Sequence, residues 1–183
     1  AGFDKSQESM DKFWQICHGA IAEGVDALII HGRSVKELYR DRADWEIVSE
    51  VKRKFPHATI IGSGDLMTAE TIIERISTSG LDGVIIARGA IGNPWIFNET
   101  RALWEGRPKP KRPSLTEQGE VYLKHYEMIA ETRPMLKSVR YFRKFSVGYC
   151  KHHPQRKMIQ ADLIAAKSKD DLYAAAKKWF GIG

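Results

Sequence analysis

Apolar residues in the first half of the chain follow two patterns that take turns along the sequence. Residues 10–21, 45–51 and 72–76 carry apolar side chains at helical spacing, whereas residues 27–30, 59–61 and 84–86 are short continuous apolar runs. Helical spacing indicates amphipathic helices, and a short continuous run indicates a buried strand. The alternation predicts a βαβαβα array with a parallel sheet, covered by helices on at least one face.

A proline-rich segment divides the chain. Residues 107–113 contain three prolines among four basic residues. Because proline lacks an N–H group and has a fixed φ angle, this composition favours an extended and fairly stiff connector. We therefore predict two domains, residues 1–106 and residues 114–183, joined by a basic linker at 107–113.

The second domain is predicted to be all helical. Ser114 and Glu117 form a capping-box pair that begins a helix reaching to about residue 131, and Pro134 begins a second helix reaching to about residue 151. Ser168 and Asp171 are placed to cap a final helix. The second helix has two opposite faces. Its apolar face carries Met135, Val139, Phe142, Ser146 and Tyr149, and its basic face carries Lys137, Arg140, Lys144 and Lys151.

Charge is distributed unevenly between the two halves. Residues 1–106 hold 12 Lys and Arg against 16 Asp and Glu, whereas residues 107–183 hold 17 against 7. Most charged helix faces are simply solvated, and that interpretation of the basic face stays open. The excess of positive charge in the second half favours binding of a nucleic-acid backbone.

Several classes of protein are not indicated. No apolar run reaches the length of a membrane span and no signal peptide is visible, so we expect a cytoplasmic protein without a membrane partner. Cys17 and Cys150 lack metal-ligand spacing, and the adjacent His152 and His153 precede a proline that stops the helix. We assign no metal site. The chain begins with Ala1 rather than Met, which leads us to expect a fragment of a longer protein.

Polar residues and glycines follow each predicted strand. They are His31-Gly32-Arg33, Ser63-Gly64-Asp65 and Arg88-Gly89. The carboxyl ends of parallel strands meet at one edge, where glycine amides, helix N-termini and an arginine suit a phosphate group. Two plainer interpretations stay open: the glycines merely permit tight turns, and His31 is a satisfied core histidine.

Longer motifs resemble those of one family. His31-Gly32-Arg33-Ser34, Ala43-Asp44-Trp45, Ser63-Gly64-Asp65 and the run from Arg88 to Phe97 are similar in order and spacing to the tRNA-dihydrouridine synthases. The resemblance implies an α/β fold, with the last three strand–helix units of a partial TIM (β/α)8 barrel that binds FMN, followed by an all-α helical domain that binds tRNA.

The resemblance also implies roles for single residues. His31 is expected to contact the flavin, Ser63, Gly64 and Asp65 to line the phosphate and ribityl region, and Ala87 and Arg88 to complete it. The family usually has Asn in place of Ser63 and Gly in place of Ala87. Because a carboxylate repels phosphate, we expect Asp65 to offer its N–H group while its side chain caps the turn or helix. RNA contacts are expected from Arg33, Lys137, Arg140, Arg143, Lys144 and Lys151.

The reaction implied by the resemblance reduces uridine in tRNA to 5,6-dihydrouridine, with NADPH or NADH as the reductant. A cysteine acid and a flavin-contacting lysine of the family have no counterpart here, since neither Cys17 nor Cys150 has the expected loop context. We therefore assign no catalytic residue and expect the chain to be inactive alone. The open barrel edge gives it a reason to self-associate.

Two other functions are kept as alternatives. One is a different phosphate-binding TIM-barrel enzyme, such as an isomerase or aldolase, which shares the phosphate loops but does not explain the basic helical half. The other is a non-catalytic RNA-binding fragment.

Overall fold

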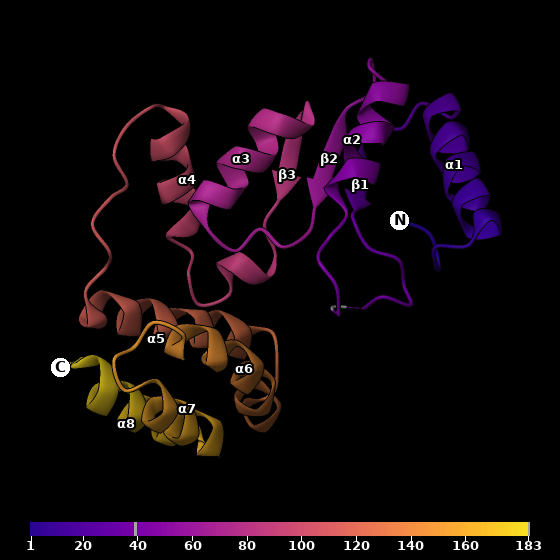
Figure 1. The fold of residues 1–183 in the computed structure, drawn as a ribbon. Coiled ribbons are helices and arrows are strands. Elements are labelled where there is room, and N and C mark those ends of the chain that lie inside the picture. The colour runs from indigo at the N-terminus through magenta and orange to yellow at the C-terminus, as the bar shows by residue number, and fades with distance from the viewer. Residues whose placement is uncertain (39, 183) are drawn as a thin grey trace. The chain divides into compact units, whose positions relative to one another are not determined.

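The computed structural model describes residues 1–38 and 40–182, without the side chains of residues 135 and 136. The chain divides into two compact units (Figure 1). The first comprises Ala1–Ala90 and Trp95–Lys109, and the second comprises Ile91–Pro94 and the chain from Pro110 onward. The described part contains eight α-helices and one sheet, so the fold is mixed α/β as expected.

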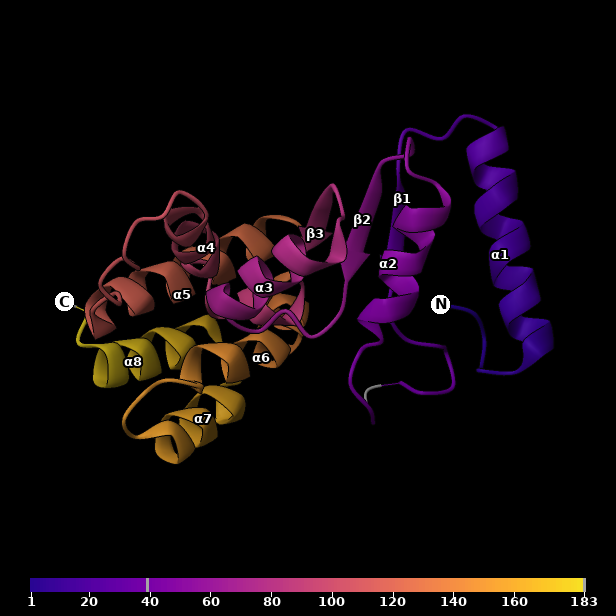
Figure 2. The same ribbon diagram turned by 45° about the horizontal axis from the view of Figure 1, so that its top comes forward.

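The first unit alternates helices and strands. Its elements are α1 (Gln7–Ala22), β1 (Leu28–His31), α2 (Trp45–Lys54), β2 (Ile60–Ser63), α3 (Ala69–Ser79), β3 (Gly83–Ile85), the 3-10 turn η1 (Arg88–Ala90) and α4 (Ile96–Trp104). The strands are parallel, with β2 between β1 and β3 (Figure 2). The predicted order of elements and the parallel sheet are confirmed.

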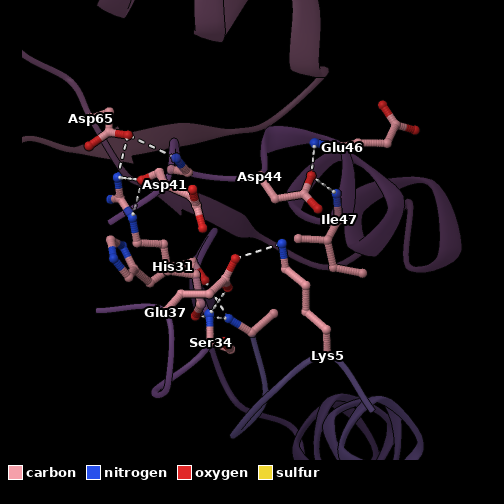
Figure 3. Close-up of polar contacts among 12 residues, drawn as sticks. Lys5, His31, Ser34, Glu37, Asp41, Asp44, Glu46, Ile47 and Asp65 are labelled. Carbon is pink, nitrogen blue, oxygen red and sulfur yellow. Dashed lines mark hydrogen bonds and ion pairs between the residues drawn. The ribbon is translucent and has the colours of Figure 1, made fainter. Parts of the chain in front are cut away.

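Side-chain oxygen atoms cap the N-termini of α1, α2 and α3. Ser6 accepts a hydrogen bond from the N–H of Ser9 before α1, Asp44 from Glu46 and Ile47 before α2, and Thr68 from Thr71 before α3. Each cap satisfies a backbone donor that lacks a partner within the helix. The Asp44 cap is visible in Figure 3.

The sheet has one covered face and one open face. Ile30 and Ile60 belong to a core cluster that includes Phe13 and Cys17 of α1, Val48 and Val51 of α2, and Ile72 of α3. On the other face Ile29 is 59% exposed and Ile85 is 39% exposed. The expectation that the apolar runs are buried strands is therefore correct for one face and wrong for the other.

The second unit consists of helices packed around an aromatic core. They are α5 (Leu115–Glu131), α6 (Met135–Cys150), α7 (Arg156–Ala165) and α8 (Lys169–Phe180). The capping boxes at Ser114 and Ser168 are confirmed. The core contains Tyr122, Tyr126, Phe142, Ile159, Leu163 and Phe180. Among the described helices of both units, none is long and apolar enough to cross a membrane.

Two contacts hold α6 and α7 in place. The segment Ile91–Pro94 packs on α6 so closely that a Cβ atom on Gly148 would lie 2.4 Å from the carbonyl oxygen of Ile91. His153, just after α6, accepts a hydrogen bond from the N–H of Gln155 at 3.0 Å, and its other ring nitrogen lies 2.9 Å from the carbonyl oxygen of Trp179. The histidine therefore fastens the start of α7 to the end of α8.

Candidate functional site

His31 and Ser63 lie side by side at the carboxyl ends of β1 and β2. They are paired in the sheet register, and the His31 Nδ1 atom is 3.3 Å from the Ser63 hydroxyl. His31 is exposed on the open face, so the interpretation as a core histidine is wrong. Partial burial, followed by the charge of Arg33, lowers the pKa of His31. The imidazole is therefore neutral at pH 7 and offers one donor and one acceptor.

Asp65 links the loops after β1 and β2. Its Oδ2 atom accepts hydrogen bonds from the Arg33 guanidinium at 2.5 Å and from the N–H of Ala43 at 2.8 Å (Figure 3). Arg33 also donates twice to the carbonyl oxygen of Asp41, at 3.1 and 2.6 Å. Its side chain is only 4% exposed. Arg33 thus fixes the loop after β1, and the structure does not place it for contact with RNA.

Arg88 is held by the other oxygen of the same carboxylate. The Asp65 Oδ1 atom accepts a hydrogen bond from the Arg88 guanidinium at 2.8 Å. The Arg88 side chain remains 41% exposed at the start of η1, which follows β3 after Ile86 and Ala87. Asp65 therefore orients an accessible cation at the carboxyl edge of the sheet. We expected its side chain to cap the turn or helix, but its hydrogen bonds come from Arg33, Arg88 and the N–H of Ala43.

The ionised state of Asp65 is favoured by these partners. Burial alone would raise the pKa of Asp65, but the hydrogen bond from Arg33, the N–H of Ala43 and the charges of Arg33 and Arg88 outweigh it. The pKa of Asp65 consequently lies below its ordinary value. One carboxylate thus pairs with two guanidinium groups, so this set of three side chains carries one net positive charge.

Gly64 and Gly89 are required by contacts between loops. A Cβ atom on Gly64 would lie 2.4 Å from the Cβ atom of Ala43, and one on Gly89 would lie 2.1 Å from the carbonyl oxygen of Leu66. Protein atoms thus fill the space where the sequence suggested an open approach for an anion. The contribution of these glycines to a phosphate site is limited to their N–H groups.

The donors at this edge fit a phosphate group. The Ser63 hydroxyl lies at the end of β2, the Arg88 guanidinium follows the neighbouring strand β3, and Ala87 between β3 and Arg88 is exposed. The N–H of Ala90 bonds to the carbonyl oxygen of Ala87 at 3.1 Å and closes η1. A hydroxyl and a guanidinium are donors that proteins use for phosphate.

The basic face of α6 is exposed as the helical spacing predicts. Lys137, Arg140, Lys144 and Lys151 all face solvent, whereas Val139, Phe142, Ser146 and Tyr149 are buried on the opposite face. The side chain of Met135 lies outside the described part of the chain. Arg143 differs from the other basic residues, because its guanidinium donates to the carbonyl oxygen of Ala166 at 3.1 and 2.5 Å. Arg143 therefore connects α6 to the end of α7, and this contact does not favour the expected role in RNA binding.

Neither cysteine is placed as a solvent-accessible acid. Cys17 is 2% exposed and Cys150 is 0% exposed. Burial raises the pKa of the Cys17 thiol and raises that of Cys150 to about 11. No group of three or more His, Cys, Asp or Glu residues suited to a metal ion occurs within residues 1–38 and 40–182.

Fold and site together define an α/β protein with imidazole, hydroxyl and guanidinium groups at the carboxyl edge of a parallel sheet. A family model described as "Dihydrouridine synthase (Dus)" matches residues 2–179. The chain belongs to this family, as its motifs indicated.

Relatives with similar sequences support the assignment. The chain is 33% identical to a probable tRNA-dihydrouridine synthase of Mycobacterium tuberculosis over 153 residues, covering 84% of this chain and 39% of the relative. A protein of the same name from Mycobacterium leprae is 31% identical, over 84% of this chain and 40% of the relative. Another protein of this name, from Rhodobacter capsulatus, is 34% identical over 63% of this chain and 35% of the relative. The chain thus spans about two fifths or less of the length of these relatives.

Proposed function

We propose that the chain supplies the cofactor-phosphate site and the RNA-binding surface of a flavin-dependent tRNA-dihydrouridine synthase. The observation that carries the proposal is the meeting of His31, Ser63 and Arg88 at one edge of the sheet in a member of this family. The relatives are named for an activity on tRNA. A cytoplasmic oxidoreductase that reduces uridine in tRNA would account for both findings.

The residues at the sheet edge have distinct roles in this proposal. Arg88 and the hydroxyl of Ser63 bind the FMN phosphate, together with the N–H groups of Gly64 and Asp65. Ala87 lies beside them, and the neutral imidazole of His31 contacts the flavin from the open face. The chemistry that bound FMN would supply is the transfer of electrons from NADPH or NADH to the 5,6 double bond of uridine. The residues of this chain bind and orient the cofactor.

The two units then have separate tasks. The first, with β1, β2 and β3, forms part of a TIM barrel, and the second is a helical domain that binds tRNA through Lys137, Arg140, Lys144 and Lys151. A barrel of this class closes with eight strands, so the active protein needs strands in addition to the three described here. We accordingly propose that the 183-residue chain is inactive by itself.

Replacement of Arg88 tests the phosphate site. In the full-length protein that contains these residues, R88M should lower FMN affinity at least about tenfold, because it removes a charge-assisted hydrogen bond to phosphate. The measurement is a titration of the flavin-free protein with FMN, followed by flavin fluorescence. R53M is the matched control, since Arg53 forms an exposed ion pair with Glu46 on α2.

The outcomes separate the proposal from its alternatives. Native affinity for FMN in R88M would contradict the phosphate site. A full-length protein that binds tRNA but no flavin, and leaves the dihydrouridine content of tRNA unchanged, would indicate a non-catalytic RNA-binding protein. Dihydrouridine formation that needs both FMN and a reduced nicotinamide would support the proposal directly.

A further inference from the structure

An aromatic ring of α6 contacts two cations. The guanidinium carbon of Arg133 is 3.9 Å from the centroid of the Tyr141 ring, and the Lys144 ammonium is 3.6 Å from the same centroid. Lys144 is also 4.9 Å from the ring centroid of Phe145. We call Arg133, Tyr141 and Lys144 the Tyr141 cluster. Its contacts lie within the range in which the negative face of a ring attracts a cation.

Within the described part of the chain, the two cations of this cluster form no ion pair with a carboxylate. Among the described residues, no ion pair includes Arg133, Lys137, Arg140 or Lys144. Elsewhere in the chain basic residues do have such partners: Lys109 pairs with Glu70 and Glu99, and Lys178 pairs with Asp162. The cluster therefore keeps its positive charge available for an anion from outside the chain.

The ring has a physical effect on both cations. Long basic side chains lose rotamer entropy when they are held in one geometry, and two like charges close together repel each other. A ring that attracts both cations offsets part of these costs before any ligand binds. Lys144 in turn lowers the pKa of the Tyr141 phenol by hydrogen bonding and by its charge, so the two side chains are coupled in the free protein.

The cluster adjoins the exposed basic face of α6. Lys137, Arg140, Lys144 and Lys151 fall on one side of the helix and extend over about 21 Å at the ordinary helical rise. A row of cations of this length suits a polyanion with regularly spaced charges. Of such ligands, the phosphodiester backbone of RNA agrees with the proposed function.

We propose that Tyr141 is a positioning residue that holds Arg133 and Lys144 in place for contact with RNA phosphates. The inference rests on the proposed function, because it takes tRNA as the ligand. Tyr141 itself carries no charge, so its contribution is distinguishable from that of a basic residue. Removal of the ring lowers affinity without changing the number of phosphates that the protein neutralises.

The test measures tRNA affinity of the full-length protein at several salt concentrations by fluorescence anisotropy. Y141L should weaken binding about three- to tenfold with an unchanged slope of log affinity against log salt. K144M should weaken binding and also reduce the slope by roughly 0.7 to 0.9, as expected for one lost phosphate contact. Y141F keeps the ring and should stay within about twofold of the native affinity.

A double-variant cycle and a control complete the test. If the ring acts through Lys144, the loss in Y141L/K144M is smaller than the product of the single losses. K169M is the matched control, because Lys169 lies 4.9 Å from the ring centroid of Tyr173 on α8, away from the basic face of α6. Thermal unfolding of each variant identifies any loss of fold. If Y141L does not fold, a double-variant cycle of R133M with K144M replaces the cycle of Y141L with K144M.

Each failure has its own meaning. Native affinity in Y141L, with weakened binding in K144M, overturns the role of the ring and leaves the proposed function intact. Absence of tRNA binding by the native protein overturns the proposed function itself. Equal competition by poly-glutamate and by unlabelled tRNA overturns the assignment to RNA phosphates and indicates a surface for acidic chains in general.

Discussion

Asp65 accepts hydrogen bonds from two guanidinium groups and one backbone N–H, so a single side chain orders three loops. We expect D65N to lower the free energy of unfolding by about 1–3 kcal/mol, because the largely buried Arg33 loses its charged partner. Urea unfolding of the native and variant proteins measures the difference. The control is E46Q, whose exposed ion pair with Arg53 should contribute less than about 1 kcal/mol.

The stability difference between the native protein and D65N should depend on pH. Because the pKa of Asp65 is lowered in the folded protein, its carboxylate stabilises the fold fully above the unfolded pKa of about 4 and loses this effect as the pH falls through the folded pKa. The stability difference between native protein and D65N should therefore be constant from about pH 7 to 5 and shrink below about pH 4. A difference that grows towards low pH would exclude the ion pair as its cause.

The positions of site residues were predictable from the sequence where these residues follow a strand. His31, Ser63 and Arg88 follow apolar runs, and parallel strands bring such residues to one edge. The roles of Arg33 and Arg143 were not predictable in this way. Both donate to backbone carbonyls, 8 and 23 residues away, in addition to the ion pair of Arg33 with Asp65, and no side-chain pattern marks a carbonyl as an acceptor.

At the scale of elements, two helical glycines should respond in opposite directions to the same change. Gly148 in α6 lies against the carbonyl of Ile91, whereas a Cβ atom on Gly19 in α1 would have no neighbour within 4 Å. G19A should stabilise the protein by about 0.5–1 kcal/mol through helix propensity. G148A should destabilise it by about 1–2 kcal/mol, because overpacking against backbone outweighs that gain.

Thermal and urea unfolding of the two variants check this prediction. Stabilisation by G148A as large as that by G19A would show that Ile91–Pro94 does not pack on α6. The sequence did not reveal this contact, since glycine within a helix has several explanations. It also left α7 unassigned, although Ile159 and Leu163 have the spacing of two residues on one buried helical face.

For the whole molecule, the uneven covering of the sheet explains where the sequence misled. A continuous apolar run indicates a strand covered on both faces, yet Ile29 and Ile85 are exposed here. Capping boxes, strand order and the parallel sheet depend on local residues and on the general handedness of connections, so they were predictable. Whether a face of the sheet is covered depends on other segments of the chain, and the apolar run of a strand does not indicate where those segments lie.

The open face leads to a last prediction, that the 183-residue chain self-associates. Ile29 is 59% exposed on β1, an edge strand of the described sheet, and apolar groups beside unpaired strand edges favour pairing with another copy. Sedimentation velocity should show a mass that rises with concentration. I29K places a charge on this face and should remain monomeric, whereas I16K, on the exposed side of α1, should associate like the native chain. A native chain that stays monomeric at high concentration, or equal loss of association in both variants, would contradict pairing through the sheet.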